Sequence, residues 1–141
     1  QGAVERLRPG LGALPREKAD GIGRILDGLE DPRPLPAVWV HGDFAPWNLF
    51  LRDGSMVACD WEYARPSGLP LFDAMHFMWM QRYLFSDRKS DVLVENLLAA
   101  FSMDTEYGNR ISKFYRCAVM VEGAMGDSAY MDFLLGTLCN A

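Results

Sequence analysis

The stretch VWVHGDFAPWNLFLRDGSMVACDWEYA, which spans residues 38–64, decides the fold of this chain. Its apolar beginning predicts a short strand over residues 37–40. The polar loop that follows this strand contains His41, Asp43 and Asn48. Carboxylate and amide side chains in such a loop are typical of a metal or phosphate site.

A β-hairpin is predicted directly after the loop. Residues 48–51 and 56–59 are largely apolar, and an Asp-Gly pair at 53–54 stands between them. This pattern is a strong hairpin signal, because the tight turn requires residues that tolerate positive φ. The hairpin folds Asp60 back towards the polar loop, so oxygen-bearing side chains are expected to converge at one end of a small sheet.

Two segments of this stretch resemble one enzyme family. The loop HGDFAPWN, residues 41–48, resembles the catalytic loop H-G-D-x-x-x-x-N of the aminoglycoside phosphotransferase and choline kinase-like family. The segment DWEYA, residues 60–64, is similar to the metal-binding D-W-E or D-F-E segment of that family. The resemblance covers less than a third of the chain. It implies a kinase that uses Mg²⁺ and ATP, or another nucleoside triphosphate, to phosphorylate a hydroxyl of an aminoglycoside-, choline- or sugar-like acceptor.

The resemblance assigns a role to each main candidate. Asp43 would align the acceptor hydroxyl as the catalytic base, while Asn48 and Asp60 would hold Mg²⁺ through oxygen atoms. Local alternatives stay open: Asp43 as a cap of loop amides, and Asn48 as a partner in a turn. A carboxylate that ends an apolar strand is a costly place for an idle charge, which favours the metal role of Asp60.

Three supporting residues complete the candidate site. His41 is expected to brace the loop by hydrogen bonds. Glu62 is either a further group on the metal side or a solvated loop side chain. Asp73 either bonds the catalytic loop from beneath, as is frequent in the family, or is a first-turn carboxylate that the helix dipole favours. His76, within an apolar helix, is expected to be a core histidine and not a ligand.

Helices are predicted for most of the remaining chain. Residues 1–14 are expected to form a loop or a frayed helix end, and residues 65–70 form a loop by composition. Hydrophobic spacing predicts helices over the ranges 15–30, 71–85, 91–101, 110–123 and 127–138. The aromatic side chains of Trp61, Phe72, Phe77 and Trp79 are expected in the core rather than around a bound substrate.

This order of elements resembles the C-terminal lobe of a protein kinase-like fold, which is α+β in class and mostly helical. We expect one lobe over residues 1–141. It consists of a leading helix and linker (1–36), the catalytic hairpin (37–64) and a helical acceptor-binding part (65–141).

The family's N-terminal lobe is not recognisable in the sequence. Neither Gly-x-Gly fragment continues to G-x-G-x-x-G, and Lys18, the only lysine before the loop, lies in a helical pattern. We therefore expect a truncated kinase whose N-terminal lobe is a missing partner, and which is inactive alone. The alternative is a catalytically inactive remnant that acts as a binding module.

The composition of the chain disfavours several classes of binding partner and of active site. The net charge of −5 and the pI of about 4.9 disfavour nucleic acids and anionic membranes as partners. Two histidines are too few for the two-metal centre of a metallophosphoesterase. Three widely spaced cysteines without a C-x-x-C pair, and no apolar span, fit a cytoplasmic protein. Acidic side chains after the hairpin would receive an amine-bearing acceptor, with Glu95, Asp104, Glu106, Glu122, Asp127 and Asp132 as candidates.

Overall fold

The chain forms two compact units, Gln1–Leu35 with Glu106–Ala141 and Pro36–Thr105. Helices predominate and the strands form two small antiparallel sheets, so the expected α+β class is confirmed. No helix among the described residues is long and apolar enough to cross a membrane. The computed structural model describes residues 3–29, 36–85, 96, 99, 105–122 and 128–139.

Helices from both ends of the chain build the first unit. Its elements are α1 (Ala3–Leu7), the 3₁₀ helix η1 (Arg8–Ala13), α2 (Arg16–Asp27), α5 (Thr105–Glu122) and α6 (Ser128–Cys139). The helices predicted at 15–30, 110–123 and 127–138 correspond to α2, α5 and α6. The start of α5 lies five residues before the predicted one.

The expectation of a loop or frayed end at residues 1–14 was wrong. Leu7 at the end of α1 is buried, and the backbone at Gly10 lies against α5. A Cβ at position 10 would be 2.4 Å from Cγ1 of Val121. Tertiary contact therefore supports turns that the glycine-rich local sequence does not predict.

Buried polar contacts join α5 to α6 in the same unit. The hydroxyls of Tyr115 and Tyr130 are 3.3 Å apart, and neither residue has exposed surface. Nη1 of Arg116 donates to Oγ1 of Thr137 at 3.1 Å. These paired groups let two helices with largely apolar faces bury polar atoms without loss of hydrogen bonds.

The second unit contains the predicted hairpin. Strand β2 (Leu49–Arg52) pairs with β3 (Ser55–Ala58), and Leu49 lies opposite Ala58. Asp53 and Gly54 have φ of 51° and 77°, as a tight hairpin turn requires. The prediction from the Asp-Gly pair is confirmed.

A second pair of strands precedes and follows the hairpin in the chain. Strand β1 (Val38–Val40) pairs antiparallel with β4 (Arg65–Gly68), where a loop was expected. The loop predicted for residues 65–70 from their Pro and Gly content was therefore wrong at residues 65–68. In a two-stranded sheet both strands are edges, and an edge strand tolerates Pro66.

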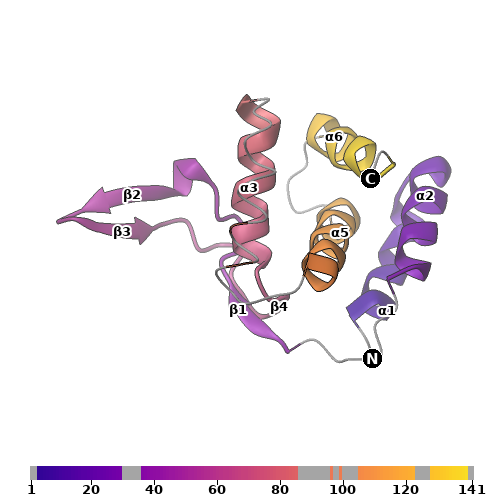
Figure 1. Ribbon diagram of the computed structural model, residues 1–141, viewed down its shortest axis with the longest axis horizontal. Coiled ribbons are helices and arrows are strands. Elements are labelled where there is room, and N and C mark those ends of the chain that lie inside the picture. Colours follow the sequence, from indigo (N-terminus) through magenta and orange to yellow (C-terminus); the bar gives the residue numbers. More distant parts are fainter. Residues whose placement is uncertain are drawn as a thin grey trace. The chain divides into compact units, whose positions relative to one another are not determined.

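Helix α3 (Phe72–Phe85) follows β4, as predicted for residues 71–85. Figure 1 shows the β2–β3 hairpin projecting to one side of α3, with β1 and β4 near the first turn of the helix. The buried residues of α3 are Phe72, Met75, His76, Met78, Trp79 and Met80. Of the helix predicted at 91–101, the structure describes residues 96 and 99 alone, and both are helical.

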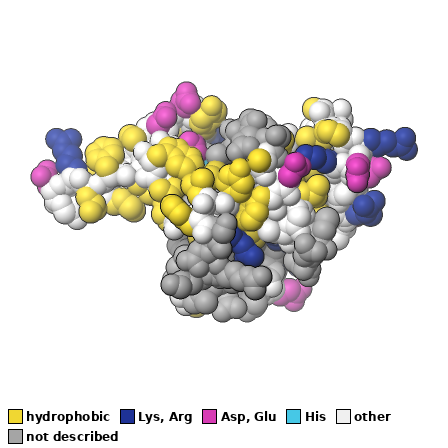
Figure 2. All heavy atoms as spheres, turned by 90° about the horizontal axis from the view of Figure 1, so that it is seen from above, with side chains coloured by type: hydrophobic (Ala, Val, Ile, Leu, Met, Phe, Trp, Pro, Cys, Tyr) yellow, Lys and Arg dark blue, Asp and Glu magenta, His cyan; other side chains and the backbone are white. Residues whose placement is uncertain are grey.

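Several large hydrophobic side chains of the hairpin are exposed to solvent. Figure 2 shows apolar side chains along this projection, and Leu51 and Met56, which pair across the strands, are 78% and 66% exposed. Trp61, just after the hairpin, is 58% exposed, so its expected place in the core was wrong. A two-stranded ribbon has no layer to cover its faces, which explains this exposure.

Replacing Gly68 with Ala is expected to lower the free energy of unfolding by about 1–3 kcal/mol. A Cβ at position 68 would lie 2.3 Å from Cγ1 of the buried Val40. Truncation of Val40 to Ala removes the obstructing methyl groups, so the double variant should lose less stability than the two single variants combined. Urea denaturation followed by tryptophan fluorescence measures all three, and strict additivity would show that the two side chains do not collide.

Candidate functional site

All of the candidate site residues belong to the unit Pro36–Thr105. His41, Asp43 and Asn48 come from the loop between β1 and β2, and this loop ends in a short 3₁₀ helix, η2 (Pro46–Asn48). Asp60 and Glu62 follow β3, and Asp73 lies in the first turn of α3.

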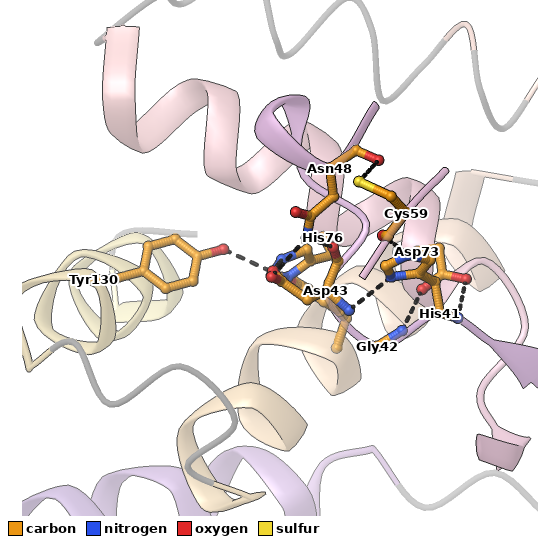
Figure 3. A network of polar contacts seen from close by, with 9 residues as sticks. His41, Gly42, Asp43, Asn48, Cys59, Asp73, His76 and Tyr130 are labelled. Carbon is orange, nitrogen blue, oxygen red and sulfur yellow. Dashed lines mark hydrogen bonds and ion pairs between the residues drawn. The ribbon is translucent and has the colours of Figure 1, made fainter. Parts of the chain in front are cut away.

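The side chains of Asn48 and His76 both contact the carboxylate of Asp43 (Figure 3). Nδ2 of Asn48 donates to its Oδ2 at 2.9 Å, and Nε2 of His76 lies 3.1 Å from its Oδ1. The Asp43 side chain keeps 20% of its surface exposed. Part of this carboxylate is therefore in contact with solvent.

The amide of Asn48 is fixed in one orientation. Its Nδ2 donates both to the backbone carbonyl of Asp43 and to Oδ2 of the same residue, at 2.9 Å each. A flipped amide would place an oxygen against two acceptors, so the carbonyl oxygen Oδ1 faces away from Asp43. Among the described residues no buried side-chain oxygen lacks a partner, and none donates to this Oδ1, so it retains contact with solvent.

The hairpin brings Asp60 next to Asn48 along the backbone. The ladder continues one pair beyond β2 and β3, because the amide N of Cys59 donates to the carbonyl of Asn48 at 2.9 Å. Asp60 is the next residue, with φ of 62°, in the left-handed region that Asp adopts more readily than most residues. It is exposed, and no described residue donates a hydrogen bond to its carboxylate. The expected cost of burying this charge was wrong, because Asp60 lies at the surface.

Three carboxylates raise the pKa of one exposed tyrosine, Tyr63. The pKa of the Tyr63 hydroxyl is raised, chiefly by the charge and hydrogen bond of Glu62 and further by Asp43 and Asp60. Within the described residues, no Lys or Arg forms an ion pair with any of these carboxylates. The site therefore has a negative potential that a cation or an amine would relieve.

Asp73 anchors the start of the loop. Its carboxylate accepts the backbone N–H of His41 at 2.8 Å and that of Gly42 at 3.0 Å. Gly42 has φ of 89°, and a Cβ there would lie 2.5 Å from the carbonyl oxygen of Tyr63. The loop thus needs both the carboxylate beneath it and a residue without a side chain at position 42.

His41 connects the loop to the segment that contains Asp60. The ring is buried, its Nδ1 accepts the backbone N–H of Asp43 at 3.4 Å, and its Nε2 lies 2.8 Å from the carbonyl of Cys59. Nε2 therefore donates. The ring also packs against Trp61, with centroids 4.5 Å apart. These contacts are those of a bracing side chain.

Sequence reasoning missed the contact between His76 and the side chain of Asp43. It was expected to be a core histidine, and it is buried, but its Nε2 reaches the Asp43 side chain. Burial lowers the pKa of His76 and Asp43 partly opposes this effect. The available signal was the spacing from Asp73, since residues three apart share a helix face.

The donor set fits Mg²⁺ better than a transition metal. No group of three or more His, Cys, Asp or Glu side chains suited to a metal occurs in the part of the chain that the structure describes. Mg²⁺ is usually held by one or two protein oxygens together with substrate phosphates and water. Asn48 and Asp60 would supply one amide and one carboxylate oxygen, and these are the kinds of oxygen that Mg²⁺ prefers.

Of the acidic candidates after the hairpin, two already have cationic partners. Asp132 pairs with Lys18, and Glu106 pairs with Arg110 at 2.8 Å. Glu122 is exposed. The other three candidates lie outside the described residues: Glu95, Asp104 and Asp127.

Replacing Asp73 with Ala is expected to lower the free energy of unfolding by about 2 kcal/mol or more, because it leaves two loop N–H groups without a charged acceptor. Chemical denaturation measures the change. Glu62→Gln, which alters an exposed carboxylate of the same unit, is the control and should stay within about 0.5 kcal/mol. Equal losses in the two variants would contradict an anchoring role for Asp73.

Stability is expected to fall as the pH drops below the ordinary histidine pKa of 6.5. The unfolded chain binds a proton at His76 there, whereas the folded chain, whose pKa is lowered, binds it only at a more acidic pH. The unfolded state thus binds more protons in this window, and the free energy of unfolding decreases with falling pH.

The variant His76→Gln isolates this contribution, because His41 is the only other histidine in the sequence. Denaturation curves over the range from about pH 8 to pH 5 should show a weaker acid dependence in the variant. Parallel curves would mean that His76 titrates alike in both states.

Comparison with known proteins bears on the family. The family model described as "Phosphotransferase enzyme family" matches residues 2–110, which is most of the chain and includes the catalytic loop, the hairpin and Asp73. No curated protein and no solved structure matches. The family expected from the HGDFAPWN loop is confirmed, and the chain belongs to the phosphotransferase enzyme family.

Proposed function

We propose that this chain is the catalytic part of a small-molecule kinase. It would transfer the γ-phosphate of ATP, or of another nucleoside triphosphate, to a hydroxyl group with the help of Mg²⁺. The observation that carries the proposal is the hydrogen-bonded pair of Asp43 and Asn48, which leaves one carboxylate edge and one amide oxygen open to solvent.

Asp43 is the proposed base. Its carboxylate accepts a hydrogen bond from the acceptor hydroxyl, orients the oxygen towards the phosphate, and takes the proton as the new bond forms. The fixed position of the side chain supports this role, because phosphoryl transfer depends mainly on alignment and on charge stabilisation.

Asn48 and Asp60 are the proposed residues that hold Mg²⁺. The ion, when bound, neutralises charge on the nucleotide phosphates. Asn48 presents a neutral oxygen whose direction is set by its bonds to Asp43, and Asp60 presents a charged one without a competing cation among the described residues. Glu62 adds negative potential on the same side.

An amine-bearing hydroxyl compound is the proposed acceptor class. The carboxylates around Tyr63 lack Lys or Arg partners in the described part of the chain, which supports the binding of a positively charged molecule. Exposed aromatic rings nearby, those of Trp47, Trp61 and Tyr63, offer faces that attract ammonium groups.

The kinase-like C-terminal lobe is part of the same proposal. Its support is the order of a catalytic loop, a metal-binding hairpin and a helix whose first-turn Asp73 bonds the loop. The N-terminal lobe of such a fold is the proposed partner, and the exposed apolar side chains of the hairpin support a contact there.

Asp43→Asn is expected to lower kcat by about 10²- to 10⁴-fold, because it removes a general base. ADP release from Mg²⁺-ATP, in a form that includes the proposed N-terminal lobe, is measured with a panel of amino sugars, amino alcohols and neutral sugars. The nucleotide Kd should stay close to that of the unsubstituted chain. A kcat within a few-fold of the value for the unsubstituted protein would show that Asp43 is not the base.

Asp60→Asn is expected to weaken nucleotide binding only when Mg²⁺ is present, because the substitution removes an anionic oxygen and leaves the fold of the hairpin intact. Calorimetric titration of ATP with Mg²⁺, and with EDTA in its place, measures the difference. The matched control is Asp53→Asn in the hairpin turn, where Asn also tolerates positive φ. Equal effects of the two substitutions would contradict a metal role for Asp60. A chain that binds no nucleotide would support the binding-module alternative.

A further inference from the structure

One turn of α3 contacts three consecutive residues of the loop. Asp73 accepts the backbone N–H groups of His41 and Gly42, and His76 reaches the side chain of Asp43. A spacing of three places Asp73 and His76 on the same face of the helix. The helix therefore holds both the backbone of the loop and its reactive side chain.

We propose that His76 is a positioning residue that fixes the carboxylate of Asp43 by donating Nε2–H to Oδ1. The inference rests on the proposed function, since His76 acts here only through Asp43. The 3.1 Å contact from His76 and the 2.9 Å bond from Asn48 engage one carboxylate oxygen each. Two donors on opposite oxygens hold the plane of the carboxylate, which a single donor would leave free to rotate.

The protonation state follows from the partner. An ionised carboxylate only accepts hydrogen bonds, so Nε2 of His76 must carry the proton. Burial lowers the pKa of His76 against the opposing effects of Asp43 and Asp73, which leaves the ring neutral at pH 7. A neutral donor orients Asp43 without adding a positive charge that would weaken its attraction for a proton. Because Nε2 already holds a proton, the ring cannot take another from Asp43 at that atom.

Burial makes this donor hard to replace. His76 is 1% exposed and its ring is parallel to that of Phe72, whereas the Asp43 side chain is 20% exposed. The histidine thus contacts the carboxylate from the interior, while part of the Asp43 side chain remains exposed to solvent. Water has little access to the position of Nε2, so loss of the imidazole would leave Oδ1 without this donor.

Nitrogen NMR of the unsubstituted chain tests the contact without any substrate. The sequence contains two histidines, so ¹⁵N-histidine labelling gives two ring systems, and His76→Gln assigns them. We expect Nε2 of His76 to be protonated at neutral pH and its signal to move in Asp43→Ala but not in Glu62→Gln. An Nδ1–H tautomer of His76, or a signal indifferent to Asp43→Ala, overturns the proposal.

Kinetics test the positioning role with two variants. His76→Gln retains an N–H donor near the place of Nε2, and His76→Leu fills similar space without a donor. With Mg²⁺-ATP and water or the best hydroxyl acceptor, kcat for ADP release should fall about tenfold or more in His76→Leu. KM for Mg²⁺-ATP should stay unchanged, and His76→Gln should restore most of kcat. Equal kcat in the two variants, at equal thermal stability, overturns the proposal.

The two proposals fail in different ways. Loss of activity in Asp43→Asn together with full activity in His76→Leu refutes the role of His76 alone. Retained activity in Asp43→Asn refutes the proposed function. If the unsubstituted chain releases no ADP, the NMR result still decides whether His76 donates to Asp43.

Discussion

The rest of the site depends on the two hydrogen bonds that the carboxylate of Asp73 accepts from the loop. A polar loop that leaves a strand has backbone N–H groups without strand partners, and buried donors need acceptors. Asp73 supplies a charged acceptor to two of them in succession, those of His41 and Gly42. Because these two residues are held, the direction of the backbone at Asp43 is held as well.

Each further element of the site is tied to this anchored loop by a specific contact. Gly42 allows the backbone of Tyr63 to approach, and His41 reaches the carbonyl of Cys59 beside the hairpin. Asn48 bonds back to Asp43 and pairs with Cys59 through its own carbonyl. The loop, the hairpin and the first turn of α3 are thus linked through short hydrogen bonds, which explains how a site forms on so little sheet.

The sequence was most informative where local chemistry dominates. Asp53-Gly54 demanded positive φ in a tight turn, and hydrophobic spacing gave α2, α3, α5 and α6 to within a few residues. The family followed from the spacing of the loop motif. These features depend on residues close together in the chain, so single-sequence reasoning can reach them.

Features that depend on distant contacts were missed. Strand β4 contains Pro66 and Gly68, and it forms only because β1 offers a partner with Val40 packed over the glycine. The turns at the start of the chain depend on Val121 in α5. The bond from His76 to Asp43 spans 33 residues and joins a helix to a loop. No local pattern specifies such pairings, because they are decided by tertiary packing.

The pairing of the hairpin strands makes the site sensitive to the number of residues in the turn. Strand side chains alternate between faces, so a shift of one residue between β2 and β3 turns every later side chain to the opposite face. Asp60 lies only one residue beyond the last backbone pair, Asn48 with Cys59. Homologous chains should therefore accept many sequences on the exposed faces of this ribbon, while an insertion or deletion of a single turn residue would shift Asp60 relative to Asn48.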